Sequence, residues 1–167
     1  MLQYVACDTL ADFLEKVDVA RAEDRRHHGI ESAIVDDALA ISDVDTQIDF
    51  MHPDGKLYIP EAEEAAPAMQ RLVQAAREAG IVHVASADDH ELTDAEISDE
   101  PDFKTTFPPH CLRGTRGALK IPETEQEAPV PLTLEPLSER YLDGREFLIL
   151  KKSFDPFTNP NTDRLLE

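Results

Sequence analysis

The segment IVHVASADDH (residues 81–90) decides the fold, because a short apolar run leads at once into carboxylates and an imidazole. Its first half is typical of a strand that is buried on both faces. Apolar residues at helical spacing over residues 60–79 precede it, and Gly80 follows them as a helix end. An earlier apolar run, ALAISDV (38–44), is typical of another buried strand. A strand, a helix and a strand in this order form a right-handed βαβ unit, which predicts a parallel sheet.

The rest of the chain continues this pattern with a long interruption. A polar insert covers residues 86–136, a further apolar run, EFLILKK, covers 146–152, and a helix is expected to begin near Asn161. The pattern predicts an α/β fold with helices on both faces of a parallel sheet. Because the predicted strands are few for such a sheet, we expect residues 38–167 to be the N-terminal portion of a larger domain. Residues 1–37 are expected to form a helical N-terminal extension.

The composition excludes some classes of partner. Among 167 residues, 35 acidic side chains outnumber 16 basic ones and give a formal net charge of −19. Such a chain lacks the basic patches that bind a nucleic-acid backbone or an anionic membrane. Its two cysteines, Cys7 and Cys111, make no disulfide framework, and no apolar run reaches membrane-spanning length. We therefore expect a cytoplasmic protein, and a homo-oligomer stays open.

Polar side chains follow each of the predicted strands. In an open parallel sheet, the ligand site lies beyond the carboxyl ends of the strands. We therefore expect these side chains to converge on one edge of the sheet. They are Asp43, Asp45, Gln47 and Asp49 at or after the end of the first strand, Asp88, Asp89 and His90 after the second, and Lys151 and Lys152 at the end of the third.

Some of these side chains have the spacing of metal ligands. Asp88 and His90 stand at positions i and i+2, so on an extended backbone they face the same way while Asp89 faces away. His110 follows in the segment TFPPHC, where adjacent prolines stiffen the backbone. An aspartate with histidines suits Zn²⁺, Fe²⁺ or Mn²⁺. The residues alone leave open an ordinary polar loop after a strand.

A lysine and an aspartate at neighbouring strand ends could carry out acid–base chemistry. The aspartate would be the base, and the lysine would hold a nearby anion or lower the pKa of a nucleophile. The alternative is a surface salt bridge, which contributes little. The sequence assigns neither cysteine as a nucleophile, although Cys111 lies beside His110.

Four motifs, taken together, resemble a known family. In chain order they are DVDTQIDF (43–50), ADDHEL (87–92), TFPPHCLRGTRG (106–117) and ILKKSFDPF (149–157). From about Ala38 to its end, the chain resembles the nicotinamidases of the isochorismatase-like cysteine hydrolase superfamily, which has a three-layer α/β/α fold. The D-x-H and PPHC motifs are typical of the metal-containing nicotinamidase branch, whereas D-x-Q-x-D-F and the lysine segment are common to the superfamily.

The resemblance implies an amidohydrolase that converts nicotinamide into nicotinate and ammonia, a reaction of NAD salvage. Asp45 matches the catalytic base, and Lys151, rather than Lys152, matches the catalytic lysine. A cysteine thiolate attacks the carboxamide carbon, ammonia leaves, and water cleaves the thioester. The implied binding residues are Asp88, His90, His110 and either Glu96 or Asp102 for a divalent metal that holds the pyridine nitrogen, and Phe50 and Phe107 for the faces of the pyridine ring.

One part of the family pattern is missing from the sequence. The nucleophilic cysteine belongs to a later strand–helix turn, and Cys111 matches the residue after the metal histidine instead. We therefore expect this chain alone to be inactive, through truncation or through natural loss of the nucleophile. The alternatives are another cysteine hydrolase of a small amide, such as a carbamoyl or maleamate-type substrate, and an inactive metal-binding relative.

Overall fold

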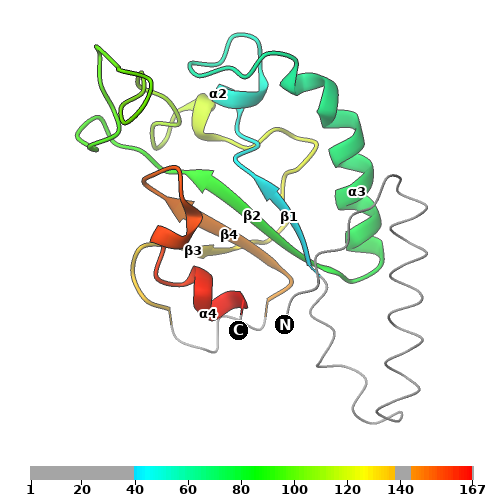
Figure 1. Ribbon diagram of the computed structural model, residues 1–167. Coiled ribbons are helices and arrows are strands. Elements are labelled where there is room, and N and C mark those ends of the chain that lie inside the picture. The colour runs from blue at the N-terminus through cyan, green and yellow to red at the C-terminus, as the bar shows by residue number, and fades with distance from the viewer. Residues whose placement is uncertain (1–39, 138–143, 167) are drawn as a thin grey trace, which may run out of the picture. The chain divides into compact units, whose positions relative to one another are not determined.

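The computed structural model describes residues 40–137 and 144–166. A four-stranded sheet with the order β1-β2-β4-β3 organises this part of the chain (Figure 1). The strands are β1 (Ala40–Val44), β2 (Val82–Asp88), β3 (Val130–Leu132) and β4 (Glu146–Lys151). The helices are α2 (Ile48–Met51), α3 (Ala66–Glu78) and α4 (Thr162–Leu166). The expected helical extension over residues 1–37 lies outside the described residues.

The sheet is parallel, as the sequence predicts. β4 pairs in parallel with β2 on one side and with β3 on the other. In Figure 1 the arrows of all the strands point toward the same edge of the sheet. The register sets Asp88, the last residue of β2, opposite Lys151, the last residue of β4. The predicted α/β fold is therefore confirmed, and its carboxyl edge brings a carboxylate beside an amine.

The strand β3 is not predicted by the sequence pattern. It is only three residues long, contains Pro131 and lies inside the polar insert. Proline cannot donate to a β-ladder, so it is tolerated mainly in edge strands, and β3 is an edge strand. The predicted strand 81–85 is also longer in the structure, because β2 continues to Asp88.

The helix α3 connects β1 to β2 and begins later than predicted. A 3-10 turn (Ala62–Ala65) precedes it, and Pro67 lies in its first turn, where the missing amide hydrogen costs nothing. Gly80 ends it with a φ of +68°, and the amide of Ile81 reaches back to the carbonyl of Ala76 at 2.9 Å. None of the described helices is long and apolar enough to span a membrane.

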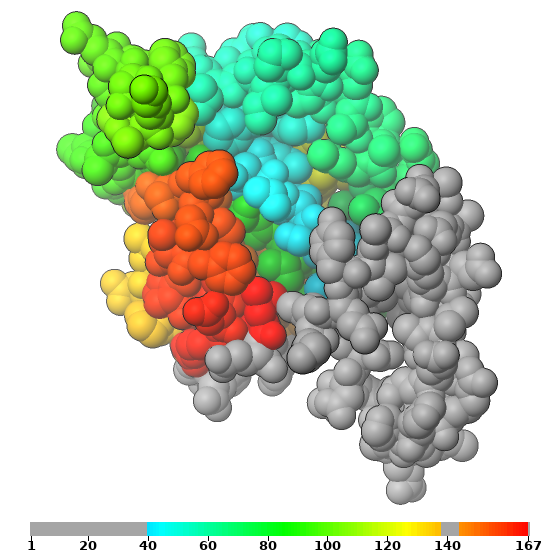
Figure 2. Space-filling model, in the orientation of Figure 1, coloured from blue at the N-terminus to red at the C-terminus, as the bar shows by residue number. Residues whose placement is uncertain are grey.

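Buried and half-buried side chains alternate along β4. Phe147, Ile149 and Lys151 are buried and share one face of the strand, so the apolar core of the sheet ends in an ammonium group. At the other side of the sheet, β1 is an edge strand, and its Val44 is 62% exposed. The segment that holds β1 (cyan) is visible at the surface in Figure 2. Among the described residues, no strand pairs with the outer edge of β1.

Candidate functional site

Lys151 is the buried centre of the site. Its side chain is 1% exposed, and its Nζ lies 2.9 Å from Asp45 Oδ2 and donates to Asp88 Oδ1. Burial lowers the pKa of Lys151, but the carboxylates of Asp88 and Asp45 raise it by more than burial lowers it, so the net shift is upward. The ammonium group is therefore protonated at neutral pH and links the end of β1 to the end of β2.

Asp45 is held in an unusual backbone conformation. Its φ is 53°, in the left-handed region that non-glycine residues seldom adopt. Its amide donates to the Ser86 carbonyl at 3.2 Å, and its Oδ1 accepts the Ser86 hydroxyl at 2.7 Å. With Oδ1 occupied by Ser86, Oδ2 is the atom that faces Lys151. The strained turn thus aims one carboxylate oxygen into the site.

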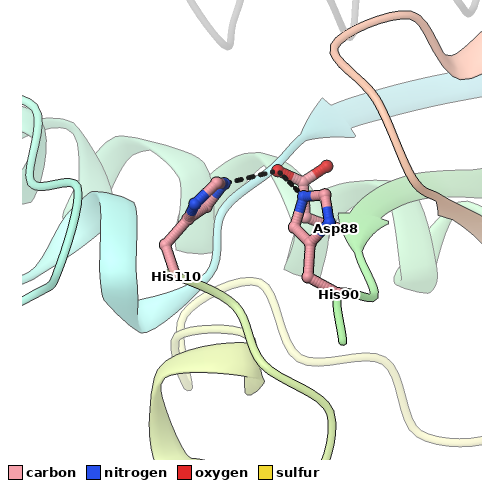
Figure 3. A group of neighbouring side chains, drawn as sticks. All are labelled: Asp88, His90 and His110. Atoms are coloured by element: carbon pink, nitrogen blue, oxygen red, sulfur yellow. Dashed lines mark ion pairs between the residues drawn. The ribbon is translucent and has the colours of Figure 1, made fainter. Parts of the chain in front are cut away.

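Asp88, His90 and His110 form a compact group in which one ligand atom from each residue lies within 4.8 Å of the others. Figure 3 shows both imidazoles directed at the Asp88 carboxylate, and Asp88 Oδ2 lies 3.4 Å from His110 Nε2 and 3.7 Å from His90 Nε2. All three side chains are buried. Within the described residues, His90 Nε2 has no hydrogen-bond partner. A divalent cation between these atoms would satisfy it.

The far side of each imidazole has its own acceptor. His110 Nδ1 lies 2.8 Å from the Pro108 carbonyl, and His90 Nδ1 lies 3.2 Å from Asp94 Oδ2. Metal-binding histidines commonly donate their second ring nitrogen to such an oxygen, which fixes the tautomer. The donor set and its outer partners therefore fit a divalent metal.

The structure separates the two candidates for a fourth ligand. Glu96 Oε2 lies 3.6 Å from His90 Nε2. Asp102 instead accepts hydrogen bonds from the amides of the three residues that close its own exposed loop, Lys104, Thr105 and Thr106. These hydrogen bonds hold the pKa of Asp102 well below its usual range. We therefore keep Glu96 as the candidate and set Asp102 aside.

Asp88 contacts Lys151 with one carboxylate oxygen, Oδ1, and faces the imidazoles of His90 and His110 with the other, Oδ2. Burial alone raises the pKa of Asp88, but contacts with His110 and His90 and the charge of Lys151 hold it well below the usual range. For His110, burial lowers the pKa, whereas Asp88 and the Pro108 carbonyl raise it above its ordinary value. The carboxylate of Asp88 is therefore ionised at any physiological pH.

Phe50 and Phe107 both lie against His110. The ring centroids of Phe50 and His110 are 5.4 Å apart at an interplanar angle of 62°, and those of Phe107 and His110 are 6.2 Å apart at 79°. Phe50 belongs to the short helix α2, and Phe107 precedes the two prolines. Both expected aromatic residues thus lie next to one candidate ligand.

Cys111 has the wrong environment for a nucleophile. It is fully buried, with a φ of 44°, and its amide donates to Asp49 Oδ2 at 2.7 Å. Burial is the main cause that raises the pKa of its thiol, and the charges of Asp88, Asp49 and Asp45 raise it further. A thiol in this setting stays protonated at neutral pH and reacts slowly.

The remaining side chains expected at the strand ends have other partners. Gln47 clamps the backbone of Asp88: its Nε2 donates to the Asp88 carbonyl at 2.8 Å, and its Oε1 accepts from the Asp88 amide at 2.7 Å. Asp89 faces away and accepts from Arg113 Nε at 2.9 Å. Asp43 lies 2.5 Å from His83 Nε2. Asp49 binds the Cys111 amide. Lys152 Nζ lies 2.8 Å from Asp94.

Sequence reasoning gave no role to Asp94. It lies in the polar insert, four positions after His90, where no periodic pattern indicates a partner. Gln47 was expected at the sheet edge, but the sequence carries no signal that its amide would hold the Asp88 backbone. The motif D-x-Q-x-D-F is the available clue to that residue.

Comparisons with known proteins give a family match and solved structures with the same fold. The isochorismatase domain family matches residues 38–167 of the chain. No curated protein sequence gives a significant match. A pyrazinamidase/nicotinamidase from Streptococcus mutans is 24% identical with a TM-score of 0.55, over 76% of this chain and 64% of that one.

Further solved structures share the fold. A nicotinamidase/pyrazinamidase from Bacillus subtilis is 22% identical with a TM-score of 0.54, over 76% of this chain and 63% of that one. An N-carbamoylsarcosine amidase from Thermoplasma acidophilum is 22% identical with a TM-score of 0.53, over 76% of this chain and 59% of that one. The chain thus spans 59% to 64% of the length of these three structures.

Proposed function

The chain belongs to the isochorismatase domain family, and on this premise we propose that it provides the acid–base and metal-binding part of an amidohydrolase resembling nicotinamidase. The proposed reaction converts nicotinamide into nicotinate and ammonia. The observation that carries the proposal is the position of Asp88, whose carboxylate contacts Lys151 on one side and His90 and His110 on the other. A base, a cation and a metal site are thereby joined at one edge of the sheet.

Asp45 and Lys151 support the acid–base role. In the proposed reaction, Asp45 removes the proton from a cysteine thiol, and the Lys151 ammonium stabilises the resulting thiolate. The thiolate attacks the carboxamide carbon, and the proton held by Asp45 passes to the departing nitrogen, which leaves as ammonia. A water molecule, deprotonated by Asp45, then cleaves the thioester and restores the thiol. The distance of 2.9 Å between Lys151 Nζ and Asp45 Oδ2 suits this pairing.

The proposed metal ligands are Asp88, His90 and His110, with Glu96 as the fourth. Zinc, iron(II) or manganese(II) would suit this set of one or two carboxylates and two imidazoles. The bound metal would supply a Lewis acid that holds the pyridine nitrogen of the substrate. The unpartnered Nε2 of buried His90 supports this role, since a buried ring nitrogen rarely lacks a partner.

Phe50 and Phe107 are proposed to contact the ring of the substrate. Both rings lie against the imidazole of His110, which supports a place for them beside a substrate ring bound next to that residue. Offset and edge-to-face contacts between aromatic rings add about 0.5–1.5 kcal/mol beyond their burial. These contacts would orient the carboxamide rather than change its reactivity.

The thiol is the part of the proposal that the described residues do not provide. Cys111 is buried, and its pKa is raised by burial and by three carboxylates. β1 is an edge strand, and Asp45 directly follows it. A thiol on a segment that pairs with the outer edge of β1 would lie beside Asp45 and Lys151. The second candidate is a metal-binding relative without hydrolase activity, because Cys111, the one cysteine among the described residues, is buried and the other groups of the site do not need a thiol to bind a metal.

The test is ammonia release from nicotinamide by the protein expressed from its complete gene, with Zn²⁺, Fe²⁺ or Mn²⁺ added. We expect release that Asp45→Asn and Lys151→Met abolish and that Lys104→Met, a change of an exposed lysine, leaves intact. Release from another small carboxamide but not from nicotinamide would change the substrate within the same family. A well-folded protein that binds metal and releases no ammonia from any carboxamide would favour the non-catalytic relative.

A further inference from the structure

Asp94 lies next to the group formed by Asp88, His90 and His110, and one of its carboxylate oxygens has three hydrogen-bond partners. Asp94 Oδ2 lies 2.8 Å from the Glu91 amide, 2.8 Å from Lys152 Nζ and 3.2 Å from His90 Nδ1. The Asp94 side chain is 18% exposed and that of Lys152 is 27% exposed, so this ion pair is partly shielded from water. The arrangement ties a lysine on one strand end to an imidazole on another.

The electrostatics of this contact select one form of His90. A neutral imidazole carries a hydrogen on one nitrogen and a lone pair on the other. If the lone pair were on Nδ1, it would face the ionised oxygen of Asp94, which is repulsive. With the hydrogen on Nδ1, the ring donates to Asp94 Oδ2 at 3.2 Å, whereas the oxygens of Asp88 and Glu96 lie 3.7 and 3.6 Å from Nε2, too far to accept a hydrogen bond from that nitrogen. Nε2 is the atom that has no other partner within the described residues.

Lys152 strengthens this selection. Its ammonium group occupies the same oxygen of Asp94 and favours the ionised carboxylate. The two consecutive lysines therefore have separate tasks: Lys151 contacts the metal-group carboxylate Asp88, and Lys152 contacts the carboxylate behind His90. Lys151 is the last residue of β4, and Lys152 directly follows it.

The backbone of His90 has partners other than Asp94, although the next amide, that of Glu91, donates to Asp94 Oδ2 at 2.8 Å. The His90 amide donates to the Cys111 carbonyl at 3.2 Å, and the His90 carbonyl accepts from the Arg113 amide at 2.8 Å. These contacts fix the main chain, whereas Asp94 is the acceptor at the side chain's Nδ1. A change at Asp94 should therefore act on the imidazole ring and on the Glu91 amide, while the hydrogen bonds of His90's own amide and carbonyl remain.

We propose that Asp94 and Lys152 are a positioning pair that holds His90 in the Nδ1–H tautomer, with its Nε2 presented to Asp88 and His110. This inference deepens the proposed metal-binding function and rests on it for its purpose. Neither residue touches the substrate or the metal in this account; both act through His90. Outer-shell partners of this kind typically change metal affinity about 10- to 100-fold when they are removed.

The direct test is ¹⁵N NMR of the imidazoles in the metal-free full chain at a pH above 8, with His90 assigned by the loss of its signals in His90→Gln. We expect a protonated Nδ1 and an unprotonated Nε2 in the wild type. In Asp94→Ala we expect both tautomers, and in Lys152→Met a smaller change in the same direction. Asp94→Asn, whose amide oxygen can still accept from Nδ1, should be intermediate, and it serves if the alanine variant does not fold.

Metal affinity is the second readout, measured by competition between the chain and a chromophoric chelator for Zn²⁺. Asp94→Ala should weaken binding about 10- to 100-fold. Glu91→Gln is the matched control, because it removes a charge from the same loop while its side chain pairs with Arg113 on the surface. Lys104→Met is the corresponding control for Lys152→Met.

The outcomes separate this inference from the proposed function. A wild-type His90 with its hydrogen on Nε2, or an unchanged tautomer in Asp94→Ala, would overturn the positioning role. Unchanged Zn²⁺ affinity in Asp94→Ala would overturn it as well. If the wild type has the expected tautomer and Asp94→Ala loses it, but no divalent metal binds, the positioning role is supported and the proposed metal function fails.

Discussion

Replacing Lys151 by methionine should destabilise the metal-free protein strongly at neutral pH. The change removes the ammonium group and leaves Asp88, whose side chain is 6% exposed, without its cation. Asp45 loses the same partner but is 23% exposed, so water compensates part of its loss. Breaking a buried ion pair from one side costs about 3–5 kcal/mol, and we expect a value near the lower end of this range, because Asp88 keeps its contacts with the imidazoles.

The assay is urea unfolding followed by circular dichroism in the presence of a metal chelator, with Lys104→Met as the exposed control. The pH dependence gives a second check. In the wild type the folded pKa of Asp88 is lowered, so its contribution is present above its unfolded pKa and is lost as the pH falls through the folded pKa. Without Lys151 the folded pKa of Asp88 should rise, so the deficit should shrink in acid. A Lys151→Met variant as stable as Lys104→Met at pH 7 would refute this reasoning.

Three further changes probe the surroundings of the site. Gln47→Ala removes the amide that clamps the Asp88 backbone and should cost about 2–4 kcal/mol in urea unfolding, since buried polar groups then lose their partners; a loss below that of an exposed Gln74→Ala control would contradict the clamp. Gly117→Ala should cost about 1–3 kcal/mol, because a Cβ there would overlap the Asp49 carboxylate that holds the Cys111 amide; a melting temperature equal to the wild type's would count against that contact. The metal-free protein should lose stability as the pH rises through the raised folded pKa of His110, because the stabilisation of protonated His110 by Asp88 is fully present only below its unfolded pKa of 6.5. If the urea midpoint changes with pH between 6 and 8.5 in the same way in the wild type and in His110→Gln, this prediction is wrong.

The sequence predicts the sheet well where apolar runs are long enough to form a pattern. The strands that end at Asp88 and Lys151 follow from such runs, and so does the helix between β1 and β2. β3 escapes prediction because it is three residues long, and its place in the sheet depends on pairing with the distant strand β4. Pairing between remote segments is a tertiary effect that local composition does not encode.

In the candidate site, too, local sequence pattern predicts some residues, whereas others come together only through contacts between distant segments. Asp88 and His90 can be predicted together because strand periodicity makes them face the same way. His110 lies twenty positions after His90, so its link to them comes from the TFPPHC segment and the resemblance rather than from strand periodicity, and the fold brings its Nε2 to within 3.4 Å of Asp88 Oδ2. The choice between Glu96 and Asp102 also depends on the path of the polar insert: one approaches His90, and the other is used by its own turn. Asp94 and Lys152 meet for the same reason.

The most direct test of the central claim is a titration of the metal-free chain with Co²⁺, followed by the visible absorption of the bound ion. The account predicts one equivalent bound with the bands of nitrogen and oxygen ligands, and loss of this site in His90→Gln and His110→Gln but not in Asp102→Asn. A well-folded chain that binds no Co²⁺, or that binds it equally after both histidines are replaced, would contradict the assignment of Asp88, His90 and His110 as a metal site.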